Sequence, residues 1–368
     1  MSSASATIFV RPIARLLYTS RTNPPIASTS THLKMELPIV TDLMDAWTTE
    51  SFNTPLIRKK IEVPRITKPD QLLLKVEASS LNPIDVRLTE GYGDEVLSKW
   101  SQLESSNYNP LSLCSAEKFG RLPLITGRDF SARVVAVGSN VKTYIPGDEV
   151  IGVIPVHWQG AHAEYCVAPV YGVAKKPLSV SHVEATTMPY AACTAWNALV
   201  TLLKAWGVPK IVATCSDKNC EMVENLGAKA IDYNSTTAKE QIIDEGPFEV
   251  ILDCADSELA RWSDQIMGVW RNCVHVSLVS PLLADTDRYG APMGLATSLV
   301  KMFCRSYKSA IHGRWNAYAF FVPNSDCLDQ ISLLIDQQKI KPVVEKVYSF
   351  SDVPEAYAQA GKGHTRGK

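Results

Sequence analysis

The chain has 368 residues, of which 46% are hydrophobic and 20% charged, and its formal net charge is −1. This length predicts one large domain or two smaller ones with ample material for a core. No long basic run suggests nucleic-acid binding, and no stretch approaches the roughly 18 apolar residues that a transmembrane helix requires. The nine cysteines are an odd number with no C-x-x-C pair, which predicts reduced, buried thiols instead of a disulfide framework.

The first 34 residues differ in composition from the rest of the chain. They contain Arg11, Arg15, Arg21 and Lys34, are rich in Ser and Thr, and include no acidic residue. Apolar triplets flank the two early arginines, a pattern typical of a mitochondrial transit peptide. The alternative is a disordered tail, because Pro12 interrupts any helix in this segment. We therefore expect a mitochondrial protein whose folded part begins near Met35.

Short strands separated by turns are predicted from residue 35 to about residue 180. Residues 71–78 alternate and then run apolar, as a half-buried strand does. Further strands are expected over 133–137, 149–155 and 161–168. The polar residues 107–119 predict a long surface loop.

Strands and helices alternate after residue 181. Helical spacing covers 183–203, with Pro189 as a break, and residues 217–226 form a second helix that Gly227 ends. Strands are predicted at 211–214, 230–233, 248–252 and 273–279, and a last strand and helix at 343–344 and 353–359. This alternation predicts an α/β fold with a parallel sheet covered on both faces.

Several short motifs follow one another in an informative order. They are SLNPID (80–85), GY (91–92), TGRDFS (126–131), PGDEV (146–150), GAHAEY (160–165), TAW (194–196) and LGA (226–228). Together they resemble medium-chain dehydrogenase/reductases of the zinc-free quinone oxidoreductase type, over nearly all of the chain after Met35. The resemblance implies a GroES-like β-barrel catalytic domain (35–180 and 340–368) and a Rossmann-type NADPH-binding domain (181–339).

The resemblance also indicates how reduction would proceed. Zinc-dependent relatives carry His and Glu where this chain has Arg128 and Asp129, and an arginine cannot ligate a metal. We therefore expect no metal site. Asn82 and Tyr92 match family positions that line the nicotinamide pocket, where both side chains could donate hydrogen bonds to the substrate oxygen. The alternatives are that Asn82 shapes a turn and that Tyr92 caps a loop.

The predicted cofactor is NADPH. NAD-preferring sites place an acid at the end of the second strand, whereas this chain has Ser216 and, close behind, Lys218, which suit a 2′-phosphate. Ser216 could instead be only the N-cap of its helix. The resemblance implies further cofactor contacts at Thr194, Tyr233, Leu278, Tyr318, Phe320, Arg366 and Gly367.

The glycine-rich turn that holds pyrophosphate has no counterpart in this sequence. The only G-x-G triplets, at 91–93 and 361–363, do not lie between a strand and a helix. Between TAW (194–196) and Cys215 there is no room for a strand, the turn and a helix. The Rossmann domain is thus expected to lack its first, central strand, unless residues 210–215 move into the vacant place. Relatives of this type continue after the match at 366–368 with a last apolar strand, and the resemblance implies that this strand is missing here, because this sequence stops at Lys368.

Two function classes therefore stay open. The first is an NADPH-dependent reductase of quinones or other conjugated carbonyls, which the resemblance links to mitochondrial ubiquinone. The second is a catalytically inactive member of the family, which acts through protein contacts, with reticulon-type membrane proteins as the implied partners, or has no function.

Overall fold

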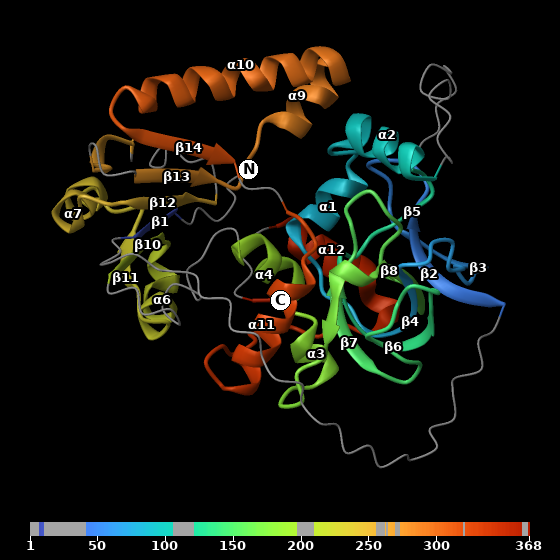
Figure 1. Cartoon of the computed structure of the whole chain (residues 1–368). Helices are drawn as coiled ribbons and strands as arrows, with labels where there is room; N and C mark the ends of the chain where they lie inside the picture. Colours follow the sequence, from blue (N-terminus) through green and yellow to red (C-terminus); the bar gives the residue numbers. More distant parts are fainter. Residues whose placement is uncertain are drawn as a thin grey trace.

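The computed structural model describes residues 7–10, 42–105, 121–196, 210–254, 262, 264–268, 273–318, 321–362 and 367–368. The fold is α/β, with two lobes side by side (Figure 1). The first lobe contains two antiparallel sheets. Their strands, in spatial order, are β3 (Ile57–Glu62), β2 (Leu43–Thr49) and β5 (Leu124–Ile125) in one, and β8 (Tyr165–Pro169), β4 (Gln71–Ala78), β6 (Asp129–Val137), β7 (Glu149–Val153) and β9 (Val173–Lys175) in the other.

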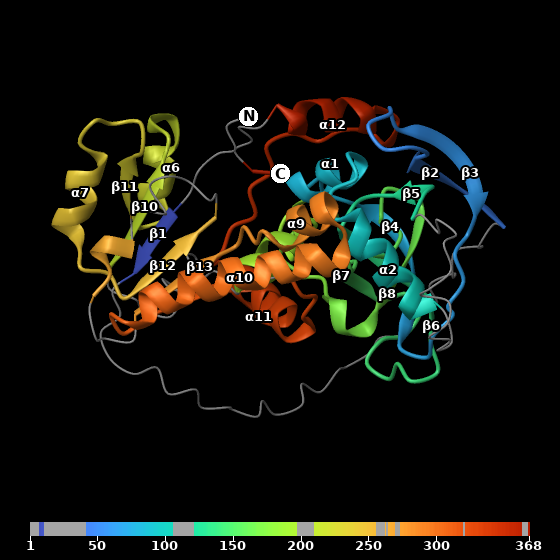
Figure 2. The ribbon, with the colours of Figure 1, turned by 90° about the horizontal axis from the view of Figure 1, so that it is seen from above.

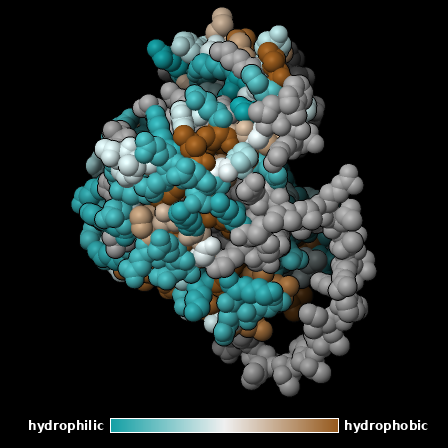
Figure 3. Space-filling model, turned by 90° about the vertical axis from the view of Figure 1, so that its left-hand side faces the viewer, coloured by the Kyte–Doolittle hydropathy of each residue, from teal (hydrophilic) through white to brown (hydrophobic). Residues whose placement is uncertain are grey.

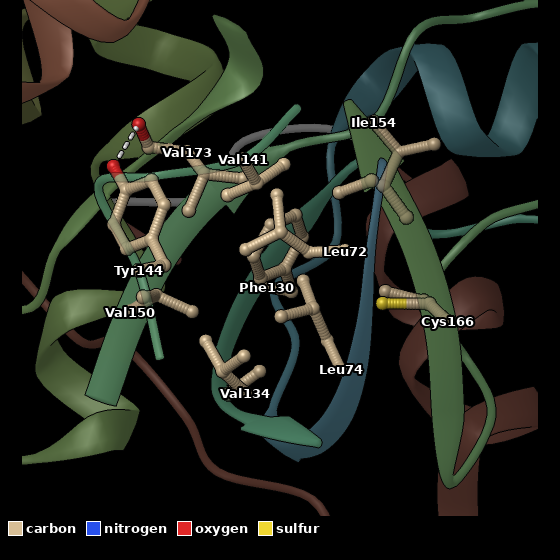
Figure 4. Packing of buried hydrophobic residues seen from close by; sticks show 13 residues of the cluster. Leu72, Leu74, Phe130, Val134, Val141, Tyr144, Val150, Ile154, Cys166 and Val173 are labelled. Atoms are coloured by element: carbon tan, nitrogen blue, oxygen red, sulfur yellow. Dashed lines mark hydrogen bonds between the residues drawn. The ribbon is translucent and has the colours of Figure 1, made fainter. Parts of the chain in front are cut away.

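Apolar side chains from the five-stranded sheet fill the interior of the first lobe (Figure 4). Leu72 and Leu74 of β4 meet Phe130 and Val134 of β6, and all four are fully buried. The alternation predicted for residues 71–78 therefore produces the strand that lies at the centre of this core. The strands expected at 133–137, 149–155 and 161–168 are likewise present in β6, β7 and β8.

The second lobe contains a six-stranded sheet. Its order is β11 (Lys229–Asp232), β10 (Ile211–Cys215), β1 (Thr7–Val10), β12 (Val250–Asp253), β13 (Cys273–Ser277) and β14 (Arg314–Tyr318). The pairs β10–β11, β12–β13 and β13–β14 are parallel, as the Rossmann-type pattern predicts. The helices of this lobe are α6 (Cys220–Asn225), α7 (Ala238–Glu245), α9 (Leu282–Tyr289) and α10 (Ala291–Ala310).

Strand β1 corrects one expectation from the sequence and decides against one alternative. Thr7–Val10 pairs antiparallel with both β10 and β12, so this part of the segment 1–34 belongs to the sheet instead of lying outside the fold. Residues 210–215 have not moved into the central place, because β1 separates β10 from β12. The physical reason is that two central strands leave a row of unpaired main-chain groups between them. The run Ile8-Phe9-Val10 has the β-branched and aromatic composition that suits a strand.

The remaining helices lie on the first lobe. They are α1 (Pro83–Thr89), α2 (Asp94–Ser105), α3 (His182–Ala185), α4 (Pro189–Trp196), α11 (Ser325–Asp336) and α12 (Val353–Gly361). Sequence analysis placed α4 and α11 in the Rossmann domain, but both pack in an apolar cluster with β7 and β9. Residues 343–344 do not form the expected strand. The loop predicted at 107–119 lies outside the described residues. No helix in the described part of the chain has the length and hydropathy to cross a membrane.

A proline in the centre of β1 tests its place in the sheet. The variant Phe9→Pro loses one main-chain donor inside the sheet, and we expect it to lower the free energy of unfolding by about 1–3 kcal/mol. Urea unfolding of the full chain measures this change. The matched control Phe9→Tyr keeps the donor and the β propensity and should unfold like the wild type; equal stability of Phe9→Pro would contradict the assignment.

Candidate active site and nucleotide-binding edge

A buried polar cluster surrounds the Asp129 carboxylate in the first lobe. One carboxylate oxygen accepts hydrogen bonds from Ser80 Oγ at 2.6 Å and Asn82 Nδ2 at 2.8 Å, and the other accepts from the main-chain amide of Tyr190 at 2.5 Å. Lys368 Nζ donates to Asn82 Oδ1 and lies 3.4 Å from Asp129. Burial raises the pKa of Asp129, while Lys368 and the hydrogen-bond donors oppose that rise. The side chain of Asn82 is thus held on both sides, by Asp129 and by Lys368.

A second buried carboxylate fixes the TGRD turn beside Asn82. Asp85, in the first turn of α1, accepts hydrogen bonds from the amides of Asn82 at 2.8 Å and Gly127 at 2.9 Å. Gly127 has a φ of +91°, and a Cβ there would lie 2.6 Å from the ring of His162. Only glycine fits this position without strain. The motif residues 126–129 therefore form a turn of fixed geometry beside Asn82.

The side chain of Arg128 occupies the interior next to this turn. It is fully buried, and its guanidinium donates to the carbonyl oxygens of Pro155 at 2.7 Å, Trp158 at 3.0 Å and Ile125 at 3.1 Å. Its Nε lies 3.6 Å from Asp85 Oδ1. In the described residues, no three His, Cys, Asp or Glu side chains gather as metal ligands would.

Tyr92 lies where the first lobe meets the second. It sits between Gly91 (φ +89°) and Gly93 (φ +74°), and the guanidinium of Arg87 lies 5.5 Å from its ring centroid. Burial raises the pKa of Tyr92, so its phenol stays protonated and can donate a hydrogen bond at neutral pH. The amide of Gly93 donates to Asp287 of α9 at 2.6 Å, which joins the two lobes beside this tyrosine.

The residues expected to hold the cofactor gather at one edge of the six-stranded sheet. Ser216 and Tyr233 directly follow β10 and β11, Leu278 follows β13, and Tyr318 ends β14. The carboxyl ends of these parallel strands point toward the first lobe (Figure 1). Neighbouring strands are about 4.8 Å apart, so the edge from β10 to β14 spans about 19 Å. Ligands of open α/β sheets bind at this edge.

Other residues expected to hold the cofactor lie away from this edge of the sheet or outside the described residues. Thr194 lies on α4, where its hydroxyl donates to the carbonyl oxygen of Tyr190 at 2.7 Å. Gly367 has a φ of +151° and lies against Val343, where a Cβ would come within 2.8 Å of the carbonyl oxygen. Phe320 and Arg366 lie outside the described residues. Ser216 is the N-cap residue of the short 3₁₀ turn Asp217–Asn219, and exposed Lys218 is in that turn.

Strand β1 occupies the central place in this edge. Thr7 pairs with Asp253, so the amino end of β1 lies beside the carboxyl ends of the parallel strands. A Rossmann sheet has here a parallel strand that leads into a glycine turn and the N-terminus of a helix. An antiparallel strand runs in the opposite sense and cannot lead into such a turn at this edge.

Two residues of the site were not predicted to have a role in it. Lys368 and Tyr190 are far from Asn82 in the sequence, and only the fold brings them to the Asp129 cluster. The ring of Tyr190 stacks on Phe321 at a centroid distance of 4.2 Å. Burial raises the pKa of Tyr190, and the charges of Asp85 and Asp129 add to the rise. No local pattern in the sequence indicated these contacts.

Comparison with known proteins agrees with this arrangement. Residues 68–178 match the family model described as "Alcohol dehydrogenase GroES-like domain", and residues 226–368 match the one described as "Zinc-binding dehydrogenase". The chain is 44% identical to "Reticulon-4-interacting protein 1, mitochondrial" of Caenorhabditis elegans over 353 residues, covering 88% of this chain and 94% of the relative. The chain belongs to the medium-chain dehydrogenase/reductase family.

Further relatives of this medium-chain dehydrogenase/reductase support the same assignment. "NAD(P)H oxidoreductase RTN4IP1, mitochondrial" of Homo sapiens is 33% identical, covering 89% of this chain and 88% of the relative. The quinone oxidoreductase structure from Coxiella burnetii has a TM-score of 0.66 at 22% identity, covering 88% of this chain and 98% of that one, and shows the fold. These comparisons confirm the family resemblance. The names of the relatives also confirm the mitochondrial location.

A buried histidine gives this medium-chain dehydrogenase/reductase a testable pH dependence. His162 Nδ1 lies 3.0 Å from the hydroxyl of Tyr357, and burial lowers the pKa of His162. Below about pH 6.5 the unfolded chain binds a proton here that the folded chain does not, so stability falls as pH falls, by at most about 1.4 kcal/mol per pH unit.

We expect the variant His162→Gln to lose less stability than the wild type between about pH 7 and pH 5. Urea unfolding at each pH measures the slope. His312→Gln, which changes an exposed histidine, serves as the control and should keep the wild-type slope. An unchanged slope in His162→Gln would contradict the neutral, buried state of His162.

Proposed function

We propose that this chain is an NADPH-dependent oxidoreductase that reduces quinones or other conjugated carbonyls by direct hydride transfer, without zinc. The observation that carries the proposal is the alignment of Ser216, Tyr233, Leu278 and Tyr318 along one edge of the sheet. This edge points toward the lobe that carries Asn82 and Tyr92 (Figure 1). The names of the relatives, "NAD(P)H oxidoreductase" and quinone oxidoreductase, support the same reaction class.

The residues at the sheet edge fit the adenosine end of NADPH. Ser216 offers a hydroxyl and exposed Lys218 an ammonium group, and both suit a 2′-phosphate better than the two free hydroxyls of NAD. Tyr233 lies beside Ser216, because its amide bonds to the carbonyl of Cys215 at 3.1 Å. In the proposed complex its ring contacts the adenosine. The bound nicotinamide would supply the hydride.

Protein groups then stabilise the charge that develops on the substrate oxygen. The protonated phenol of Tyr92 donates a hydrogen bond to that oxygen in the proposed mechanism. Asn82 donates one amide hydrogen to Asp129 and accepts a hydrogen bond from Lys368, and in the proposed mechanism its second amide hydrogen is donated to the substrate oxygen. Asp85 and Asp129 have positioning roles, since their oxygens bind main-chain amides and Asn82.

The proposed reaction needs no zinc ion. Arg128 stands where zinc-dependent family members carry a histidine, and its guanidinium is bound to three main-chain carbonyls. A fixed positive charge at this position repels a cation, and the guanidinium has no lone pair for it. Inside mitochondria, ubiquinone is the acceptor that the family resemblance favours.

The place of β1 favours a second candidate function, that of a catalytically inactive family member. The alignment with the C. elegans relative has 353 positions, and the aligned 88% of this chain's 368 residues is about 324 residues. About 29 positions of the alignment therefore have no residue of this chain. This supports the loss of the segment with the glycine turn. Losing two or three charge-assisted hydrogen bonds of about 1.5–3 kcal/mol each would weaken NADPH binding by roughly 10²-fold or more. Such a protein would act by contact, with reticulon-type membrane proteins as partners, or be a non-functional isoform.

Exchange of Lys218 tests the proposed NADPH preference. If Lys218 binds the 2′-phosphate, Lys218→Ala should weaken NADPH binding by about 10-fold or more and leave NADH binding unchanged. Nicotinamide fluorescence titration measures both affinities. Lys229, at the amino end of β11, provides the control Lys229→Ala. Saturable wild-type binding without this difference would refute the assignment, and no wild-type binding would favour the inactive candidate.

Removal of the Tyr92 hydroxyl tests the proposed catalytic role. We expect Tyr92→Phe to lower kcat for quinone reduction by about 10²-fold while the melting temperature stays within a few degrees, because one donor to the developing charge is lost. Steady-state kinetics with NADPH give the result. Tyr171→Phe, an exposed tyrosine of the first lobe, is the matched control. An unchanged kcat in Tyr92→Phe would remove Tyr92 from the mechanism.

A further inference from the structure

Two cysteine side chains meet where β10 leads into α6. Cys215 is the last residue of β10 and Cys220 the first of α6, and their sulfur atoms lie 3.6 Å apart. Figures 1 and 2 place α6 on the outside of the second lobe, beside β10 and β11. The carbonyl oxygen of Ser216 accepts the amide of Asn219 at 2.8 Å and the Cys220 thiol at 3.8 Å. The two sulfur atoms need about 1.6 Å of further approach to reach the disulfide length of about 2.0 Å.

The two thiols differ in their access to solvent. Cys215 is 7% exposed, and burial, together with the contact with Cys220, raises the pKa of Cys215 to about 12. Cys220 is partly exposed, and the described surface on the side of the second lobe is mostly hydrophilic (Figure 3). A water-soluble oxidant therefore reaches Cys220 first, while Cys215 lies behind it as a protonated thiol.

A second pair of thiols in the described residues lacks this access. Cys193 of α4 and Cys327 of α11 also share a hydrogen bond. Both are at most 2% exposed, and both lie in the apolar cluster with β7 and β9. Of these two pairs, the one formed by Cys215 and Cys220 combines contact between the sulfur atoms with access for an oxidant.

We propose that Cys215 and Cys220 are a redox-active pair, which hydrogen peroxide closes to a disulfide and a dithiol reductant opens again. In the first step the Cys220 sulfur attacks one peroxide oxygen, the O–O bond breaks, and a sulfenic acid and one water form. In the second step the Cys215 sulfur displaces the hydroxyl of that sulfenic acid, which leaves with the Cys215 proton as a second water. The two sulfurs have then lost two electrons, and the peroxide has gained them.

The disulfide would enclose the turn that carries the proposed 2′-phosphate contacts. Ser216 and Lys218 lie between the two cysteines, and the side chain of Asn219 donates to Ser216 Oγ at 3.2 Å. Drawing Cys220 toward Cys215 shifts this turn and removes the thiol hydrogen that Ser216 accepts. Oxidation therefore weakens NADPH binding, a consequence that rests on the proposed function.

Peptide mapping of the full chain tests the disulfide without any cofactor. The protein is treated with hydrogen peroxide, its remaining thiols are blocked with N-ethylmaleimide, and it is denatured and digested with trypsin. Trypsin cuts after Lys210, Lys218 and Lys229. The disulfide therefore joins peptide 211–218 to peptide 219–229, and dithiothreitol separates them. We expect this linked pair in most of the oxidised wild type.

Two variants make the map specific. Cys220→Ser should give no linked pair, whereas Cys304→Ser, which changes an exposed cysteine of α10, should give as much as the wild type. Unlinked peptides in the oxidised wild type, whether their thiols are blocked or Cys220 is oxidised to a sulfinic acid, would overturn the proposal. A disulfide from Cys220 to any cysteine other than Cys215 would overturn it as well.

Fluorescence titration with NADPH, after removal of the peroxide, measures the effect on the cofactor separately. We expect the oxidised wild type to bind NADPH at least about tenfold more weakly than the reduced wild type, and dithiothreitol to restore the affinity. Peroxide should leave the affinity of Cys220→Ser unchanged. Equal affinities of the two wild-type forms would overturn the effect on the turn. A reduced wild type that binds no NADPH would count against the proposed function, while the peptide map still decides the disulfide.

Discussion

The parallel strands β10 and β12 require a partner between them. Each would otherwise present unpaired main-chain groups along one edge in the middle of the sheet, and this is costly where the groups are buried. Thr7–Val10 supplies that partner and pairs with both neighbours. The second lobe therefore depends on a short segment near the start of the chain, and without Thr7–Val10 the sheet would lose its central strand.

The two lobes carry different parts of the proposed chemistry. In the first, the carboxylates of Asp85 and Asp129 fix the TGRD turn and the side chain of Asn82. In the second, parallel strand ends bring Ser216, Tyr233 and Tyr318 to one edge. Asp287 links the lobes through the amide of Gly93, next to Tyr92 and to the helix pair α9–α10.

Much of this arrangement could be predicted from local patterns. Residues 71–78 alternate and form β4, and Gly227, with a φ of +89°, ends the helical segment predicted before it. The motifs predicted the family because they are short turns with strict geometry, as Gly127 illustrates. Non-local pairing could not be predicted: nothing near Thr7–Val10 indicates strands more than 200 residues away. The contact of Lys368 with Asn82 was missed for the same reason.

Hydrogen exchange of the β1 amides tests the central claim most directly. If Thr7–Val10 completes the sheet, the amides of Ile8, Phe9 and Val10 should exchange as slowly as those of β10 and β12, because all three strands open together. The intact full chain undergoes exchange and is then digested, and mass spectrometry of the peptides gives these rates. Exchange of residues 8–10 at the rate of an unstructured peptide, beside protected β10 and β12, would show that the sheet closes without β1 and would contradict the account.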